Sequence, residues 1–271
     1  MFLDVTRLRD FYASRLGAVT ARLVSAAIRE LWPDLSGQSV LGLGYAVPYL
    51  GSLMEPVRAR GPERVIAIMP ARQGVHPWPV RPLATGTGRA RSGNLVALCA
   101  EHALPLPDAS IDRVLLIHAL ETTEEFRALL REVWRILAPA GRVLAVVPNR
   151  SGPWALSEKT PFGYGRPFSR SQLEEAFRQC MFTPGVRGAS LFMPPFASRA
   201  GLRALMAAER LGRRWWSGLG GVLMMEAEKQ IYAMTGTAQP AMPRRRVVVL
   251  PQPQGGVNAA DQSRDLRTKR P

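Results

Sequence analysis

The sequence predicts an α/β fold in which helices cover both faces of a mostly parallel β-sheet. Short apolar segments of the buried-strand type alternate along the chain with amphipathic segments of helical spacing, and this alternation is typical of parallel sheets. The chain has 271 residues, and 46% of them are hydrophobic, which suffices for one sizeable core. We therefore expect one main domain with a ligand site at the carboxyl ends of its strands.

The chain begins with a region of helical periodicity. Apolar side chains recur from Leu8 to Leu31 at the spacing of an amphipathic helix, which indicates either one helix or two consecutive helices. Pro33 ends this region, because proline disfavours helical geometry at Trp32. We assign residues 1–38 as an N-terminal helical segment.

Five apolar segments that follow are expected to be strands, with helices between most of them. The predicted strands are residues 39–45, 64–70, 94–100, 113–120 and, after a break at the helix end, 138–149. The predicted helices are residues 48–61, 122–137, 169–180 and 198–216. Thr122 with Glu125, and Ser169 with Gln172, have the spacing of capping boxes. Residues 70–93 contain too much Pro, Gly and Arg for a regular element and are expected to form a long loop.

The formal net charge of +15 is spread through the chain, with a concentration at its end. From about residue 235 the composition turns to Pro, Gln, Gly and Arg, which predicts a disordered basic tail over residues 235–271. The tail lacks interleaved aromatic residues, and the chain has no folded RNA-binding signature, so a nucleic-acid partner is not expected.

Cysteine and histidine usage restricts the cellular setting and the chemistry. The two cysteines, Cys99 and Cys180, lie in apolar segments, which favours reduced thiols and a cytoplasmic location. No segment reaches the ~20 apolar residues of a spanning helix. The three histidines are scattered without metal-ligand spacing, so no metal site is expected.

Three stretches of the chain resemble a known family. They are "VLGLGYAVPYL", "LPLPDASIDRVLLIHALE" and "LLREVWRILAPAGRVLAVVPN", which together span residues 40–149. In this order they resemble the class I S-adenosylmethionine-dependent methyltransferases of type 11. The resemblance implies a Rossmann-like sheet of seven strands with an antiparallel last hairpin, and we assign residues 39–234 to this domain.

The resemblance also implies a cofactor site for S-adenosylmethionine. The positions that correspond to the family's site, or lie beside it, are Gly42, Gly44, Tyr45, Ala46, Met69, Trp78, Glu101, His102 and His118. Glu101 keeps the acid that meets the adenine amino group. Gly42 and Met69 stand where the family has acidic residues, and a thioether cannot replace the carboxylate that holds the ribose. We expect His76 and Trp78 of the long loop to help cover the adenine or the ribose.

The remaining candidates concern the methyl acceptor. Residues 148–173 form a loop after the fifth strand that is rich in aromatic and basic residues, and we expect Trp154, Phe162, Tyr164 and Arg166 to bind a flat or anionic substrate. His118 is a candidate general base, and otherwise a packed histidine.

The primary interpretation is methyl transfer to an unidentified small molecule or protein, through proximity and alignment. The alternative is a non-catalytic adaptor or regulatory binding protein on the same fold, with a protein partner.

Overall fold

The computed structural model describes residues 3–54, 61–79, 83–84, 90–91, 93–196, 198–215 and 220–230. They belong to one compact unit, Met1–Ile231. The predicted tail, residues 235–271, lies outside the described residues.

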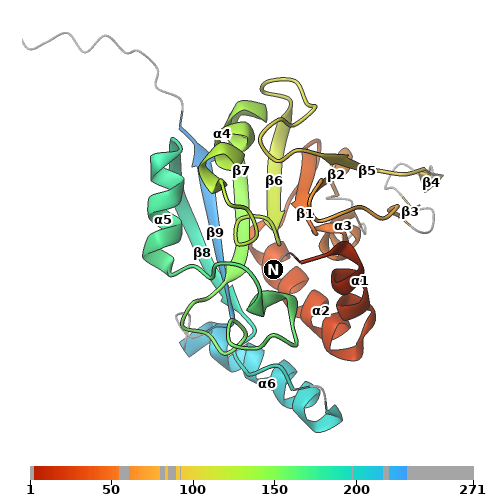
Figure 1. Cartoon of the computed structure of the whole chain (residues 1–271), viewed down its shortest axis with the longest axis vertical. Helices are drawn as coiled ribbons and strands as arrows, with labels where there is room; N and C mark the ends of the chain where they lie inside the picture. The colour runs from red at the N-terminus through yellow and green to blue at the C-terminus, as the bar shows by residue number, and fades with distance from the viewer. Residues whose placement is uncertain are drawn as a thin grey trace, which may run out of the picture. The chain divides into compact units, whose positions relative to one another are not determined.

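A seven-stranded sheet organises the described chain (Figure 1). Its strands, in spatial order, are β5 (Val96–Cys99), β2 (Arg64–Pro70), β1 (Ser39–Gly44), β6 (Ile111–Ile117), β7 (Leu137–Pro148), β9 (Val222–Lys229) and β8 (Phe182–Ser190). The first five run parallel to one another, and β9 is antiparallel to both β7 and β8. The mostly parallel sheet with an antiparallel last hairpin is confirmed.

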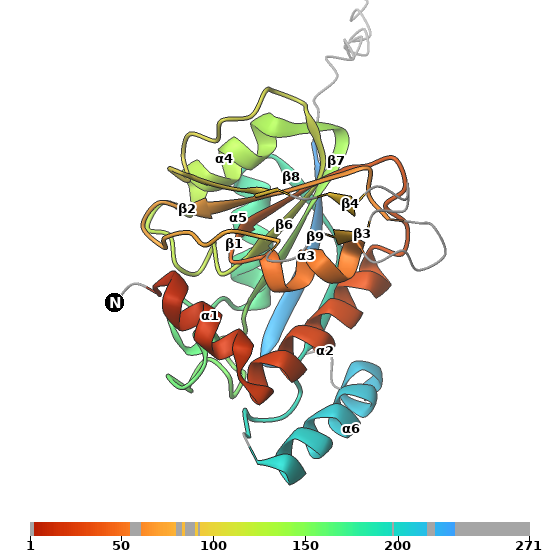
Figure 2. The same cartoon turned by 90° about the vertical axis from the view of Figure 1, so that its right-hand side faces the viewer.

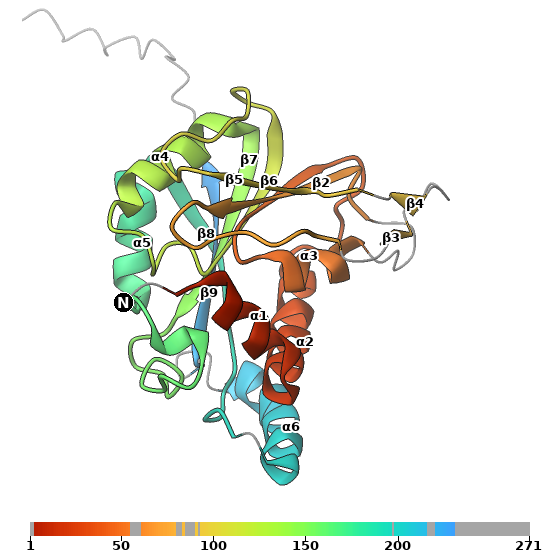
Figure 3. The same cartoon turned by 45° about the vertical axis from the view of Figure 1, so that its right-hand side comes forward.

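Helices cover both faces of the sheet, as Figures 2 and 3 show. One face carries α1 (Val5–Ala13), α2 (Arg15–Leu31), α3 (Val47–Met54) and α6 (Arg199–Trp215), and the other carries α4 (Phe126–Ile136) and α5 (Arg170–Gln179). Each face has its own cluster of buried apolar side chains. A 3-10 turn, η1 (Pro161–Gly163), lies in the long loop after β7.

The N-terminal region forms two helices rather than one. Ser14 separates them in an extended conformation (φ −73°, ψ 162°), and its hydroxyl accepts a hydrogen bond of 3.0 Å from the Gly17 N–H. Such a side-chain acceptor satisfies one of the free donors at a helix start. The second helix ends at Leu31, as the position of Pro33 predicts.

The structure corrects three local expectations. The predicted capping box of Thr122 and Glu125 is wrong: the helix begins only at Phe126, and the Thr122 hydroxyl instead donates to the carbonyls of His118 and Ala119. The loop over residues 70–93 contains a short antiparallel pair, β3 (Leu83–Ala84) with β4 (Ala90–Arg91). Strand β8 carries Pro184 and Gly185, and the sequence patterns did not predict it. The capping box of Ser169 and Gln172 is confirmed.

Among the described residues, no helix combines the length and apolarity needed to cross a membrane. The same residues hold no group of three or more His, Cys, Asp and Glu side chains arranged to bind a metal ion.

Candidate functional site

The glycine turn after β1 is shaped by its neighbours in the fold. Gly44 has φ +86°, and a Cβ there would collide with the Ile117 carbonyl of β6. The next N–H, of Tyr45, donates to that same carbonyl at 2.8 Å. At Gly42 a Cβ would lie 2.6 Å from the Leu50 side chain of α3. Both glycines are thus required by the packing of β1 against β6 and α3.

An aromatic cluster closes the carboxyl ends of β1 and β6. This aromatic cluster consists of Tyr12, Tyr45, Tyr49, His118 and Phe162. The Tyr12 hydroxyl hydrogen-bonds both the Tyr49 hydroxyl (2.6 Å) and Nε2 of His118 (2.8 Å). Its ring stacks on Tyr45 with centroids 5.6 Å apart, and the Phe162 ring lies 4.8 Å from His118. Helix α1 is therefore joined to the sheet end through Tyr12.

His118 is fully enclosed within this cluster. It adopts φ +52°, a left-handed conformation that costs energy for a residue with a Cβ. Its Nδ1 lies 3.2 Å from Oε1 of Glu121, and Gln73 donates to its carbonyl oxygen. The second carboxylate oxygen of Glu121 is buried without a hydrogen-bond partner. With both ring nitrogens engaged by protein groups, His118 has no open side toward a substrate.

Burial keeps the phenols of the cluster protonated. It raises the pKa of Tyr12 and of Tyr49 well above their ordinary value, and it raises the pKa of Tyr45 to about 12. The Tyr45 hydroxyl lies 3.0 Å from Nε2 of His76 in the long loop. The cluster thus binds the loop, α1 and the sheet through neutral hydroxyl groups.

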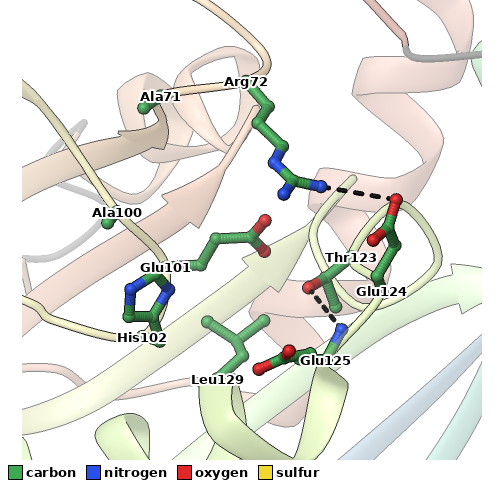
Figure 4. A pocket seen from close by; sticks show the side chains of 9 residues that line it. All are labelled: Ala71, Arg72, Ala100, Glu101, His102, Thr123, Glu124, Glu125 and Leu129. Atoms are coloured by element: carbon green, nitrogen blue, oxygen red, sulfur yellow. Dashed lines mark hydrogen bonds and ion pairs between the residues drawn. The ribbon is translucent and has the colours of Figure 1, made fainter.

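A pocket of about 330 Å³ opens at the carboxyl ends of β2 and β5, and we call it the Glu101 pocket (Figure 4). Oxygen Oε2 of Glu101 is buried there without a protein hydrogen-bond partner. Arg72 and Glu124 face each other across the pocket in an ion pair of 3.4 Å. The lining residues are Ala71, Arg72, Ala100, Glu101, His102, Thr123, Glu124, Glu125 and Leu129. An unpartnered buried carboxylate at a pocket wall offers an acceptor to a ligand N–H or O–H.

The other predicted cofactor residues are packed into the protein. Met69 and Ala46 are fully buried, and Trp78 is 8% exposed. The Trp78 carbonyl accepts a hydrogen bond from the Leu95 N–H, so the long loop lies beside the start of β5. The structure thus gathers Glu101 and His102 at one pocket, and Tyr45 and His118 in the aromatic cluster.

The four predicted substrate residues separate into two pairs. Trp154 and Phe162 are core residues with ring centroids 5.7 Å apart, and Trp154 lies directly against Gly221, next to β9. Tyr164 is half-buried and accepts a hydrogen bond from Arg7. Arg166 is exposed at the rim of a second pocket.

This second pocket, which we call the arginine pocket, has a volume of about 560 Å³ and lies between α4, α5 and the loop after β7. Its walls combine apolar side chains with three arginines, and it shares Thr123 with the Glu101 pocket. The sequence patterns did not single out Arg127 or Arg150. The lining residues are Leu120, Thr123, Phe126, Arg127, Arg150, Gly165, Arg166, Pro167, Phe168, Ser171, Gln172, Glu175, Ala176 and Gln179.

Comparison with known proteins gives a family match within the chain. Residues 52–145 match a family model described as a methyltransferase domain. No curated protein matches the chain. This match and the sheet order agree with the resemblance to the class I S-adenosylmethionine-dependent methyltransferases of type 11, and they support S-adenosylmethionine as the cofactor.

Solved structures match the chain at low sequence identity. A Haloferax volcanii complex between the Trm112 methyltransferase activator and a candidate methyltransferase matches with 17% identity and a TM-score of 0.53, over 82% of this chain and 96% of that one. A possible histamine N-methyltransferase from Thermotoga maritima has 16% identity and a TM-score of 0.46, over 83% and 92%. A Burkholderia thailandensis N1-methyltransferase with bound S-adenosylhomocysteine has 22% identity and a TM-score of 0.45, over 76% of each chain.

The described residues fit one part of S-adenosylmethionine better than the other. The Glu101 pocket offers space and an unpartnered carboxylate oxygen, which suits the exocyclic amino group of an adenine. Beside the glycine turn, in contrast, Tyr12 and Tyr45 are stacked against each other and His118 is sealed. The Glu101 pocket is therefore open to a ligand, whereas the space beside the glycine turn is closed by α1.

Proposed function

We propose that the chain transfers a methyl group from S-adenosylmethionine to an acceptor, with the adenosyl group in the Glu101 pocket. The observation that carries the proposal is the buried, unpartnered Oε2 of Glu101 at the pocket wall. When bound, the cofactor supplies an electrophilic methyl group on a sulfonium. The protein's main part is to bind and align the two reactants, which accelerates a bimolecular step.

In this proposal Tyr12 must move before the methionyl side can be occupied. Its hydroxyl is held by Tyr49 and His118, and its ring covers Tyr45. Displacing α1 would free Nε2 of His118, which only then could accept a proton from an acceptor. Closure of a helix over bound reactants also excludes water. The proposed acceptor is a small molecule or a protein. The two free thiols support a cytoplasmic location for the reaction.

Isothermal titration with S-adenosylmethionine and S-adenosylhomocysteine tests the proposal. We expect both ligands to bind, and Glu101→Gln to weaken both by about tenfold, since a hydrogen bond to a charged group contributes roughly 1.5–3 kcal/mol. Glu63→Gln is the matched control, because Glu63 is exposed just before β2 and does not line the pocket. No binding of either ligand at millimolar concentration would refute the proposal.

A second candidate function is a non-catalytic adaptor, which two residues favour. Met69 stands where the ribose carboxylate is expected, and its side chain is fully buried. Gly42 stands where the first-strand acid is expected, and a Cβ there would lie 2.6 Å from the Leu50 side chain and 2.8 Å from the Ala46 Cβ. An adaptor should keep its cellular role in the Glu101→Gln variant, whereas the enzyme should lose it.

A further inference from the structure

We propose that the arginine pocket is a binding site for small molecules that combine a flat apolar body with an anionic group, a carboxylate or a phosphate. The pocket is distinct from the Glu101 pocket and touches it only at Thr123. The binding claim does not depend on methyl transfer.

The inner wall of the pocket is apolar and fixed in place. Leu120 and Ala176 are 2% and 4% exposed, and Phe168 is 9% exposed. The Phe126 and Phe168 rings meet edge to face, with centroids 6.3 Å apart and an interplanar angle of 89°. A volume of about 560 Å³ is within the range of sites for small organic ligands. This wall would take an aromatic or otherwise flat apolar group.

The pocket lining carries a net positive charge, and its arginines are able to contact a ligand. Arg127, Arg150 and Arg166 contribute three cations, against the single carboxylate of Glu175. In the described part of the chain, none of these arginines forms an ion pair with a carboxylate. Guanidinium groups without an internal acid are suited to bidentate contacts with carboxylate or phosphate oxygens.

Hydrogen bonds fix the backbone of two of the arginines and the side chain of the third. The Arg150 N–H donates to the Phe168 carbonyl at 2.9 Å, and the Arg166 N–H donates to the Glu121 carbonyl at 2.8 Å. Arg127 lies over the Phe126 ring at 4.9 Å, and its Nε and Nη2 both donate to Oε1 of Gln179. The Arg127 guanidinium is therefore positioned before a ligand binds, so part of the cost of ordering that side chain is already met.

Calorimetric titration of the full chain tests the proposal with three probes, in the absence of cofactor. They are naphthalene-2-carboxylate, 2-naphthyl phosphate and the neutral naphthalene-2-carboxamide. We expect at least one anion to bind about tenfold more tightly than the carboxamide, since charge-assisted hydrogen bonds are the stronger ones. The preferred anion identifies the group that the pocket takes. Equal binding of all three probes, or no binding at millimolar concentration, would overturn the proposal.

Variants locate the site. The double variant Arg150→Gln with Arg166→Gln should remove the preference for the anion and leave carboxamide binding unchanged. Arg131→Gln, an exposed position on α4 outside the pocket lining, removes one positive charge, as Arg150→Gln alone does, and should keep the preference. Equal weakening by Arg131→Gln would assign the effect to overall charge and refute the site. If the double variant does not fold, Arg150→Gln alone should reduce the preference several-fold.

The experiments distinguish a failure of the arginine-pocket proposal from a failure of the proposed methyl-transfer function. Loss of anion binding in the double variant with unchanged S-adenosylhomocysteine binding concerns the arginine pocket alone. Glu101→Gln, conversely, should leave naphthalene-2-carboxylate binding unchanged.

Discussion

The hydroxyl of Tyr12, on α1, lies 2.8 Å from Nε2 of His118, at the end of β6. The two residues are 106 positions apart in sequence, and the contact joins the first helix to the centre of the sheet. Because the Tyr49 hydroxyl also meets Tyr12, the Tyr12 phenol participates in two partly buried hydrogen bonds.

We predict that Tyr12→Phe destabilises the fold by about 1–3 kcal/mol, because it leaves His118 and Tyr49 with unpaired buried polar atoms. Urea unfolding followed by circular dichroism measures the free energy of unfolding. Tyr164→Phe is the control: its hydroxyl accepts only an exposed hydrogen bond from Arg7, and we expect a change within about 0.5 kcal/mol. Equal effects of the two substitutions would contradict the structural role of Tyr12.

Two glycines should respond to alanine with opposite signs. Gly44→Ala places a Cβ against the Ile117 carbonyl at φ +86°, and we predict a loss of about 1–3 kcal/mol or more. Gly51 lies within α3 with open space around it, so Gly51→Ala should stabilise the protein by up to about 1 kcal/mol. Thermal unfolding of the two variants in parallel checks the difference. A stable Gly44→Ala variant would mean that the turn after β1 has another conformation.

The loss of folding stability at acidic pH should depend in part on Glu132. Hydrogen bonds from the Arg135 side chain are the largest cause that lowers the pKa of this carboxyl below its ordinary value of 4.5. A lowered folded-state pKa means that the unfolded chain binds the proton first, so the contribution to stability is present above pH 4.5 and is lost as the pH falls below it. We predict that the difference in unfolding free energy between the wild type and Glu132→Gln shrinks from about pH 6 to about pH 3. A difference that stays constant over this range would exclude the effect.

Most strands of the sheet were predictable because each is a short apolar segment that can be recognised in the sequence by itself. Residues 65–70, which follow Arg64, are apolar throughout, and burial on both faces of a parallel sheet demands this. Strand β8 has no such signal, since Pro184 and Gly185 interrupt it and its pairing with β9 shifts beside them. Only its tertiary position next to β9 makes it a strand.

The candidate site was predictable in part. Glu101 was proposed because it stands at the position of the family's acid at the end of a strand, and it lines a pocket. The roles of Tyr12 and Tyr49 were not, because the hydrogen bonds of Tyr12 to Tyr49 and to His118 join three distant segments. Trp154 and Phe162 were expected to line a site, but an aromatic-rich loop has the same composition whether its rings face a ligand or the core. Here both rings are buried.

The loop after β7 packs against Gly220 and Gly221, which are synthesised about seventy residues later than the start of the loop. Asn149 hydrogen-bonds the carbonyls of Gly220 and Gly221, through its side chain and its backbone N–H respectively, and Trp154 packs on Gly221. During synthesis these partners are absent until β9 has emerged and inserted between β7 and β8. The nascent chain can form β1, β2 and β6 early, whereas the start of the loop that carries Arg150 and Arg166 lacks its contacts with Gly220 and Gly221 until those residues have emerged. A ribosome stalled before residue 220 would therefore display a sheet without a finished arginine pocket.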